Sequence, residues 1–145
     1  MLLNFKRGEL KQKLDFYLNN DPRFKKIFEQ TKLKFDNSNL TAHNFEHAYR
    51  DTINALVIGE AEKADMSIVL PAAVMHDIGF LYGASGEKHA EVGAENLEKY
   101  LNEIGIIYEE KQRQQIASCI RTHKGAAMNE NPETLEAKVV ADADF

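Results

Sequence analysis

Apolar residues recur every three to four positions through most of this chain, which is the spacing of helices with one buried face. We expect seven helices, over residues 6–19, 21–32, 44–64, 66–79, 89–104, 109–123 and 135–145. Asn, Ser, Asp and Gly gather between them, at residues 33–42, 81–88 and 124–131, and these side chains favour loops. No segment has the strict alternation of a half-buried strand. The pattern predicts an all-α fold, a compact bundle of about seven helices.

Local signals mark several of the helix ends. Asp21 followed by Pro22 reads as an N-cap with proline in the first helical turn, and Asn131 followed by Pro132 repeats that signal before the last segment. Asp65 or Ser67 is expected to cap the fourth helix, and Gly79 is expected to end it.

Length and composition narrow the class of protein. At 145 residues we expect a single domain with a real core. The net charge of -5 argues against nucleic acid or an anionic membrane as a partner. The single cysteine, Cys119, and the lack of a long apolar stretch favour a cytoplasmic protein. We also expect a truncated chain, because it stops at Phe145 directly after an acidic motif.

The most unusual stretch follows the apolar run of residues 68–75, where His76 and Asp77 stand side by side. Two ionisable groups at the edge of a core segment are costly to bury unless something satisfies them. A metal ion would satisfy both.

Other candidate ligands lie on either side of this pair. They are His43, His47, His89 and His123, with Asp142 and Asp144 near the end of the chain. Taken singly, each fits a helix cap or a solvated side chain, so the argument rests on the set. Imidazole mixed with carboxylate suits Mn, Fe, Co, Ni or Zn better than Mg, and the lack of a cysteine cluster excludes a structural zinc finger.

Three blocks of this sequence resemble the H…HD…D signature of the HD-domain superfamily of metal-dependent phosphohydrolases. Residues 43–47 (His-Asn-Phe-Glu-His) are similar to its opening block, residues 73–79 to its apolar-HDIG block, and residues 139–144 to its closing apolar-x-DAD block. The resemblance implies an HD-domain helical bundle over residues 41–145, preceded by a helical extension over residues 1–40.

By position, the resemblance implies that one ion is held by His47, His76, Asp77 and Asp144. His43 would orient the site as a neighbour of the ligands, and Asp144 is preferred to Asp142 because the family ligand is the aspartate that follows the alanine.

Residues 88–94 and 121–123 resemble blocks of HD subgroups that carry additional histidines. By the same resemblance, His89 and His123 would hold a second ion and Asp77 would bridge the two. The cofactor is therefore expected to be one or two divalent transition-metal ions.

The resemblance implies hydrolysis of a phosphoester or phosphoanhydride by a metal-activated hydroxide at His76 and Asp77. Arg50, Lys88 and Lys124, together with Arg121, are cationic candidates for neutralising phosphoryl oxygens, although each alone also fits a solvated surface charge.

The expected partner is a small phosphorylated substrate of nucleotide type, and a homo-oligomer is left open. Phe80 and Leu81 stand where the guanosine-tetraphosphate hydrolases carry Glu-Asp, and Lys124-Gly125 follows His123 where the cyclic-dinucleotide branch carries Gly-Tyr-Pro after paired histidines. Both branches are disfavoured, which leaves nucleotides or dinucleoside polyphosphates. Two alternative hypotheses are a regulatory HD module that binds metal or nucleotide and a metal-free helical interaction domain.

Overall fold

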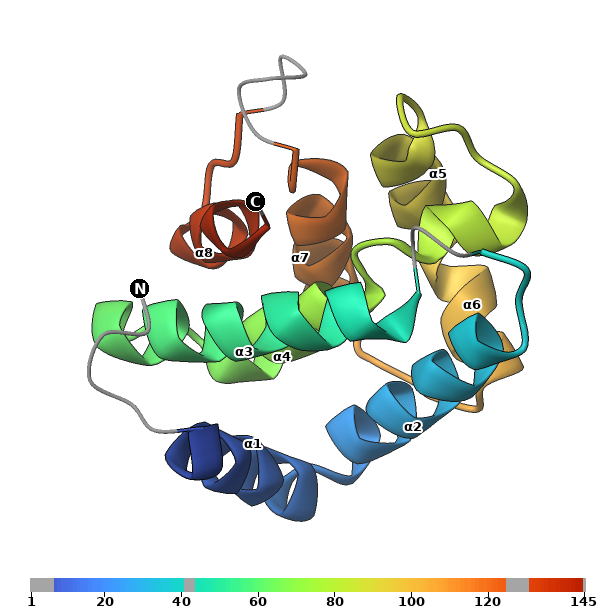
Figure 1. The fold of residues 1–145 in the computed structure, drawn as a ribbon. Helices are drawn as coiled ribbons and strands as arrows, with labels where there is room; N and C mark the ends of the chain where they lie inside the picture. Colours follow the sequence, from blue (N-terminus) through green and yellow to red (C-terminus); the bar gives the residue numbers. More distant parts are fainter. Residues whose placement is uncertain (1–6, 41–43, 125–130, 145) are drawn as a thin grey trace.

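The structure is a computed structural model that describes residues 7–40, 44–124 and 131–144. Over these ranges it contains eight α-helices and one 3-10 helix, and no strand (Figure 1). This confirms the predicted all-α fold. No helix in the same ranges combines the length and the apolar character that crossing a bilayer requires.

The elements follow one another around a central helix. They are α1 (Arg7–Asn20), α2 (Pro22–Asp36), α3 (Phe45–Glu62), α4 (Met66–Met75), η1 (Ile78–Tyr82), α5 (His89–Glu95), α6 (Leu97–Glu103), α7 (Glu110–Arg121) and α8 (Leu135–Ala143).

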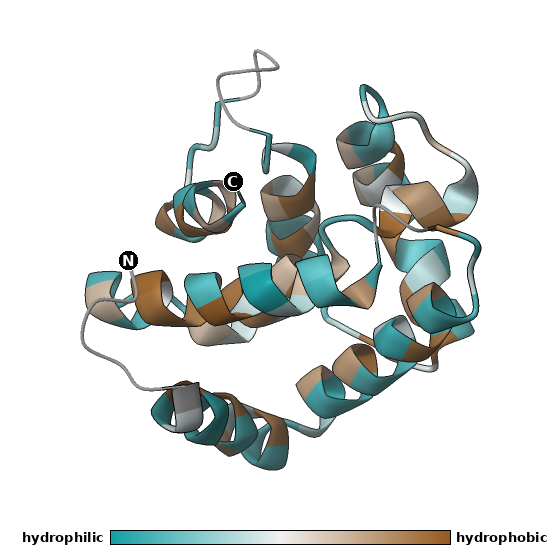
Figure 2. Ribbon diagram, viewed as in Figure 1, coloured by the Kyte–Doolittle hydropathy of each residue, from teal (hydrophilic) through white to brown (hydrophobic). Residues whose placement is uncertain are grey.

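Helix α4 is the core of the molecule. Every residue from Ile68 to Met75 is buried, and the helix packs against α2, α3, α7 and α8. The surrounding helices instead carry both apolar and polar residues around their circumference (Figure 2). Each large apolar side chain that leaves water contributes about 1.5 to 3 kcal/mol, so α4 and the faces packed on it fix where its C-terminal end lies.

Helix α2 joins the N-terminal segment to this core. Asp21 caps it by accepting a hydrogen bond from the backbone N–H of Phe24, with Pro22 at the first position, as predicted. The predicted end at residue 32 was wrong, because the helix continues to Asp36. Phe35 is buried there, and its burial outweighs the loop preference of the residues that follow.

Two other helix boundaries differ from the prediction. The single helix expected over residues 89–104 is divided at Asn96, whose side-chain Nδ2 donates to the carbonyl of Val92 at 2.8 Å while its backbone N–H donates to the same carbonyl at 3.0 Å. The last helix is capped by Thr134, which accepts from the backbone N–H of Ala137, and not by Asn131.

Candidate metal centre

Helix α3 supplies the first side of the site. Asn44 caps it by accepting a 3.4 Å hydrogen bond from the backbone N–H of His47, which places this histidine in the first turn. Asp51 follows four residues later and so lies on the same face of the helix. The side chain of His47 is 28% exposed, whereas that of Asp51 is 6% exposed.

The C-terminal end of α4 supplies the second side. The helix ends at Met75, so the prediction that it stops at Gly79 was wrong. His76 is its C-cap, and the chain turns at Asp77 into η1. Both side chains are buried, because they stand at the inner end of an entirely buried helix.

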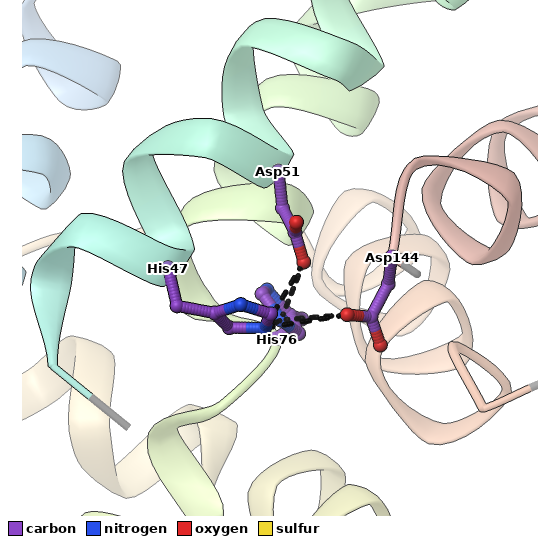
Figure 3. A group of neighbouring side chains, drawn as sticks. All are labelled: His47, Asp51, His76 and Asp144. Atoms are coloured by element: carbon purple, nitrogen blue, oxygen red, sulfur yellow. Dashed lines mark hydrogen bonds and ion pairs between the residues drawn. The ribbon is translucent and has the colours of Figure 1, made fainter. Parts of the chain in front are cut away.

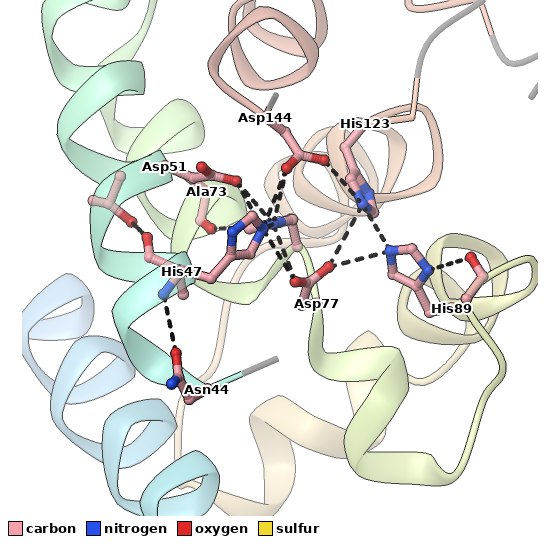
Figure 4. A network of polar contacts seen from close by, with 12 residues as sticks. Asn44, His47, Asp51, Ala73, Asp77, His89, His123 and Asp144 are labelled. Carbon is pink, nitrogen blue, oxygen red and sulfur yellow. Dashed lines mark hydrogen bonds and ion pairs between the residues drawn. The ribbon is translucent and has the colours of Figure 1, made fainter. Parts of the chain in front are cut away.

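Three further residues reach the same point from helix ends (Figure 4). His89 is the first residue of α5, His123 lies two residues after α7, and Asp144 directly follows α8. Asn54 of α3 fixes the end of α8, because its side-chain Nδ2 donates to the carbonyl of Ala143 at 3.3 Å. Helix ends therefore gather residues that lie far apart in the sequence.

The buried histidines share one hydrogen-bonding pattern. Nδ1 of His76, His89 and His123 lies 2.6, 2.7 and 2.6 Å from the backbone carbonyl three residues earlier in the chain. A carbonyl oxygen only accepts, so each Nδ1 carries a hydrogen, and in a neutral ring the Nε2 lone pair is then free. This is the tautomer that a metal ligand needs.

These Nε2 atoms point at one another. Nε2 of His89 lies 3.0 Å from Nε2 of His123, and Nε2 of His76 lies 3.4 Å from Nε2 of His47. The Nε2 lone pairs of His89 and His123 repel each other unless a proton or a metal ion lies between them. The donor atoms are therefore arranged for a cation.

The carboxylate of Asp77 lies between two pairs of histidines. Its Oδ1 is 3.1 Å from Nε2 of His89 and 3.7 Å from that of His123. Its Oδ2 is 3.5 Å from Nε2 of His47 and 3.4 Å from that of His76. One carboxylate so placed can contribute one oxygen to each of two ions.

Asp144 spans the cluster in the same way. Its Oδ1 lies 3.3 Å from Nε2 of His47 and 3.8 Å from that of His76, while its Oδ2 lies 3.7 Å from that of His123. The ligand atoms of two groups lie within 4.8 Å of one another: His47, Asp51, His76 and Asp144 in one, and His76, Asp77 and His123 in the other. Figure 3 shows the first group. The mixture of imidazole and carboxylate fits a divalent transition metal.

The charges in the cluster also call for a cation. Burial lowers the pKa of His76, but the carboxylates of Asp77, Asp51 and Asp144 outweigh it and raise that pKa to about 10. Burial, and then the charge of His76, lower the pKa of His123 to about 3. Burial opposes ionisation of Asp77, yet the histidines around it hold its pKa well below the ordinary range. Carboxylate charge is thus in excess, and a proton on His76 compensates part of it.

The six predicted ligands therefore come together. Asp142 is exposed, and His43 lies outside the described residues. Arg50, Lys88 and Lys124 are exposed, and the Nζ of Lys88 is 3.8 Å from a carboxylate oxygen of Glu91.

Sequence reasoning missed Asp51. Its spacing of four residues from His47 on one helix face was the available signal, but such spacings are common on solvated helices. Only the packing of α3 against α4 shows that this face is buried.

Comparisons with known proteins agree with this geometry. A search of curated proteins found no significant match. The chain is similar to the crystal structure of a predicted HD superfamily hydrolase from an uncultured Thermotogales bacterium, with 29% sequence identity and a TM-score of 0.65. That match covers 83% of this chain but 65% of the other, so this chain spans just under two thirds of its length. The family model of the HD domain matches residues 44–144, and the chain belongs to the HD-domain family.

Proposed function

We propose that this protein is a metal-dependent phosphohydrolase that cleaves a phosphoester or phosphoanhydride bond of a nucleotide-type substrate. One observation carries the proposal: the Nε2 atoms of three buried histidines face two carboxylates, Asp77 and Asp144, and each of these carboxylates faces more than one histidine. Such a set holds divalent ions, and the family assignment supports hydrolysis as the use to which they are put.

The residues divide into two groups around the central carboxylate. His47, His76, Asp77 and Asp144 would hold one ion, and Asp77, His89, His123 and the second oxygen of Asp144 would hold another. Bound divalent ions supply a Lewis acid that lowers the pKa of water and offsets the negative charge on phosphoryl oxygens.

The protein contributes to the mechanism by positioning the histidine ligands. Hydrogen bonds from Nδ1 to backbone carbonyls fix the tautomer and the ring orientation of His76, His89 and His123. Phe80 also stacks on the ring of His89, with centroids 4.3 Å apart and planes 17° from parallel. These contacts hold the ligands rigid, so that little reorganisation accompanies the reaction.

The substrate would approach past the more exposed ligands. The side chains of His47 and Asp144 are 28% and 13% exposed, whereas His76 and His123 are buried. Arg50 lies three residues after His47 on α3, and Lys124 directly follows His123. We place these two cations, and Lys88 beside His89, at the phosphate groups of the substrate, where they would neutralise charge.

The nucleotide assignment rests on sequence. Phe80, which packs on His89, and Leu81 replace the acidic pair of the guanosine-tetraphosphate hydrolases, and the additional histidines resemble those of HD hydrolases acting on nucleotides. Nucleoside di- and triphosphates and dinucleoside polyphosphates are therefore the substrates to assay first.

The test is turnover by protein loaded in turn with Mn, Fe, Co, Ni or Zn. We expect hydrolysis of bis(p-nitrophenyl) phosphate and release of phosphate from nucleotides, and no turnover by Asp77→Ala. Metal binding without turnover of any of these would contradict the proposal and favour a regulatory HD module. Purified protein free of transition metal, and unable to bind any, would instead favour a metal-free interaction domain.

A further inference from the structure

Asp51 is a buried carboxylate with an unsatisfied oxygen. The residue is 4% exposed, and its Oδ2 is buried without a hydrogen-bond partner. The same oxygen lies 3.2 Å from Nε2 of His47 and 3.2 Å from Nε2 of His76, although neither contact has the alignment of a hydrogen bond. A buried carboxylate oxygen without an aligned donor is costly, and His47 and His76 also face Asp77 and Asp144, so a further cation among these groups would stabilise Asp51.

The neighbours of Asp51 identify the kind of partner. Its Oδ2 points into the same space as the Nε2 atoms of His47 and His76 and the Oδ1 of Asp144 (Figure 3). Ligand atoms about 2.0 to 2.2 Å from a metal ion lie roughly 3.0 to 3.5 Å apart around it. The two contacts of Asp51 at 3.2 Å and the 3.3 Å contact between His47 and Asp144 all fall in this range.

We propose that Asp51 is a direct ligand of the ion held by His47 and His76, in addition to the aspartates of the H…HD…D signature. The proposal rests on the metal centre proposed above and concerns which of its residues bind. The ion would then have two imidazole nitrogens, from His47 and His76, and three carboxylate oxygens, from Asp51, Asp77 and Asp144.

This ligand set has a consequence for metal choice. Five protein donors with one position left for water favour six-coordinate ions, and a majority of carboxylate oxygens favours Mn²⁺ or Fe²⁺. Zn²⁺ prefers four ligands in a tetrahedron and gains least from a fifth donor. Asp51 would therefore shift selectivity toward Mn²⁺ and Fe²⁺ at the expense of Zn²⁺.

The rival role for Asp51 is that of a protonated carboxyl that binds no ion. Substitution by Asn separates the two roles, because the amide keeps the shape and donates a hydrogen bond but loses the charge. A protonated Asp51 that hydrogen-bonds to Asp144 would be replaced by Asn without loss of metal affinity. A ligand would not.

The experiment compares the wild type with D51N, D51A and the control E46Q, which removes an exposed carboxylate from the first turn of the same helix. Equilibrium dialysis with elemental analysis measures Mn²⁺ and Zn²⁺ binding, and electron paramagnetic resonance reports the symmetry of bound Mn²⁺. We expect D51N and D51A to lose Mn²⁺ affinity by at least about tenfold, with a smaller loss for Zn²⁺ and an altered Mn²⁺ spectrum. E46Q should behave as the wild type.

Folding is monitored on metal-free protein, where removal of one of the three clustered carboxylates relieves their mutual repulsion and should leave the melting temperature of D51N equal to or above that of the wild type. Folded D51N with wild-type affinity and spectrum would overturn the role of Asp51 while leaving the metal centre intact. Failure of the wild type to bind either ion would overturn the metal centre and the role of Asp51 together. If D51N does not fold, D51A supplies the same comparison. A loss of folding in both variants would contradict the unchanged or higher melting temperature that we expect when the charge is removed.

Discussion

The backbone of Gly79 lies directly against the backbone of His89, and a Cβ atom added to Gly79 would overlap the carbonyl group of His89. Gly93 of α5 completes the contact, because a Cβ atom added there would lie 3.2 Å from the backbone nitrogen of Gly79. This close approach lets α5 pack against η1 and brings His89 within 3.1 Å of Asp77. The glycine after the His-Asp pair therefore positions a histidine of the second half of the site.

Gly79→Ala should displace His89 and so weaken the second half of the metal centre. The added methyl group meets backbone, which cannot rotate away, so we expect a loss of about 1 to 3 kcal/mol in the free energy of unfolding. Metal analysis should show fewer ions per chain than in the wild type, with the group around His47 and His76 still occupied. Urea unfolding and elemental analysis provide the two readouts.

Gly8→Ala is the matched control. Nothing lies within 4 Å of a Cβ atom at Gly8 in α1, so this variant should keep the metal content and gain up to about 1 kcal/mol in helix stability. Equal metal content in Gly79→Ala and Gly8→Ala would show that the contact with His89 does not position the second half of the site.

His89→Ala should lower the number of bound ions from two to one, because this residue faces only one side of Asp77. Asp77→Ala should abolish binding, since this carboxylate faces both pairs of histidines, whereas His76→Ala should remove the ion that His47 and His76 hold. Isothermal titration with Mn²⁺ measures the stoichiometry of each variant. An unchanged stoichiometry in His89→Ala would refute the dinuclear site.

Thr31 of α2 and Tyr100 of α6 share a buried hydrogen bond of 2.7 Å between their hydroxyl groups. Tyr100→Phe should cost about 1 to 3 kcal/mol of unfolding free energy, because it leaves the Thr31 hydroxyl buried without a partner. The double variant with Thr31→Val should cost less than the sum of the two single variants, since both partners are then apolar. Urea denaturation of all three variants measures this coupling.

The control for that pair is the exposed ion pair of Lys32 and Asp36 on the same helix, where Lys32→Ala should change stability by less than about 0.5 kcal/mol. Additive losses for Thr31→Val and Tyr100→Phe would mean that the hydrogen bond does not couple α2 to α6.

Cys119 should resist thiol reagents in the native protein. Burial, and then the charge of Glu136, raise the pKa of this thiol to about 12, so it stays protonated at pH 8 and no reagent reaches it. A raised pKa in the folded state stabilises the fold below the ordinary thiol value of about 8.5, and this contribution is lost as the pH rises toward 12. Since the chain has one cysteine, reaction with a chromogenic disulfide reports it alone.

We expect no colour from native protein at pH 8, full reaction in denaturant, and stability that decreases from about pH 8.5 upward. Rapid reaction of the folded protein would show that α7 opens readily or packs differently.

Some local features of this fold are readable directly from the sequence. The apolar run before His76 predicts a buried helix, because eight consecutive apolar residues leave no face for water, and Asp21 with Pro22 predicts the start of α2. Cap chemistry and burial act within a few residues, which is why they can be recognised without a structure. The boundaries predicted at residue 32 and Gly79 were wrong because packing partners distant in sequence decided them, whereas the division at Asn96 accompanies a local side-chain hydrogen bond to Val92.

The sequence by itself determined which residues could bind a metal: histidines and aspartates in recognisable blocks, each next to an apolar segment that packs in the core. Only the tertiary structure decided that Asp77 faces two pairs of histidines, that three histidines present Nε2 to the cluster, and that Asp51 lies among them. The physical reason is distance along the chain. A helix periodicity fixes which face a residue occupies, but the packing of α3, α5, α7 and α8 around α4 fixes which faces meet.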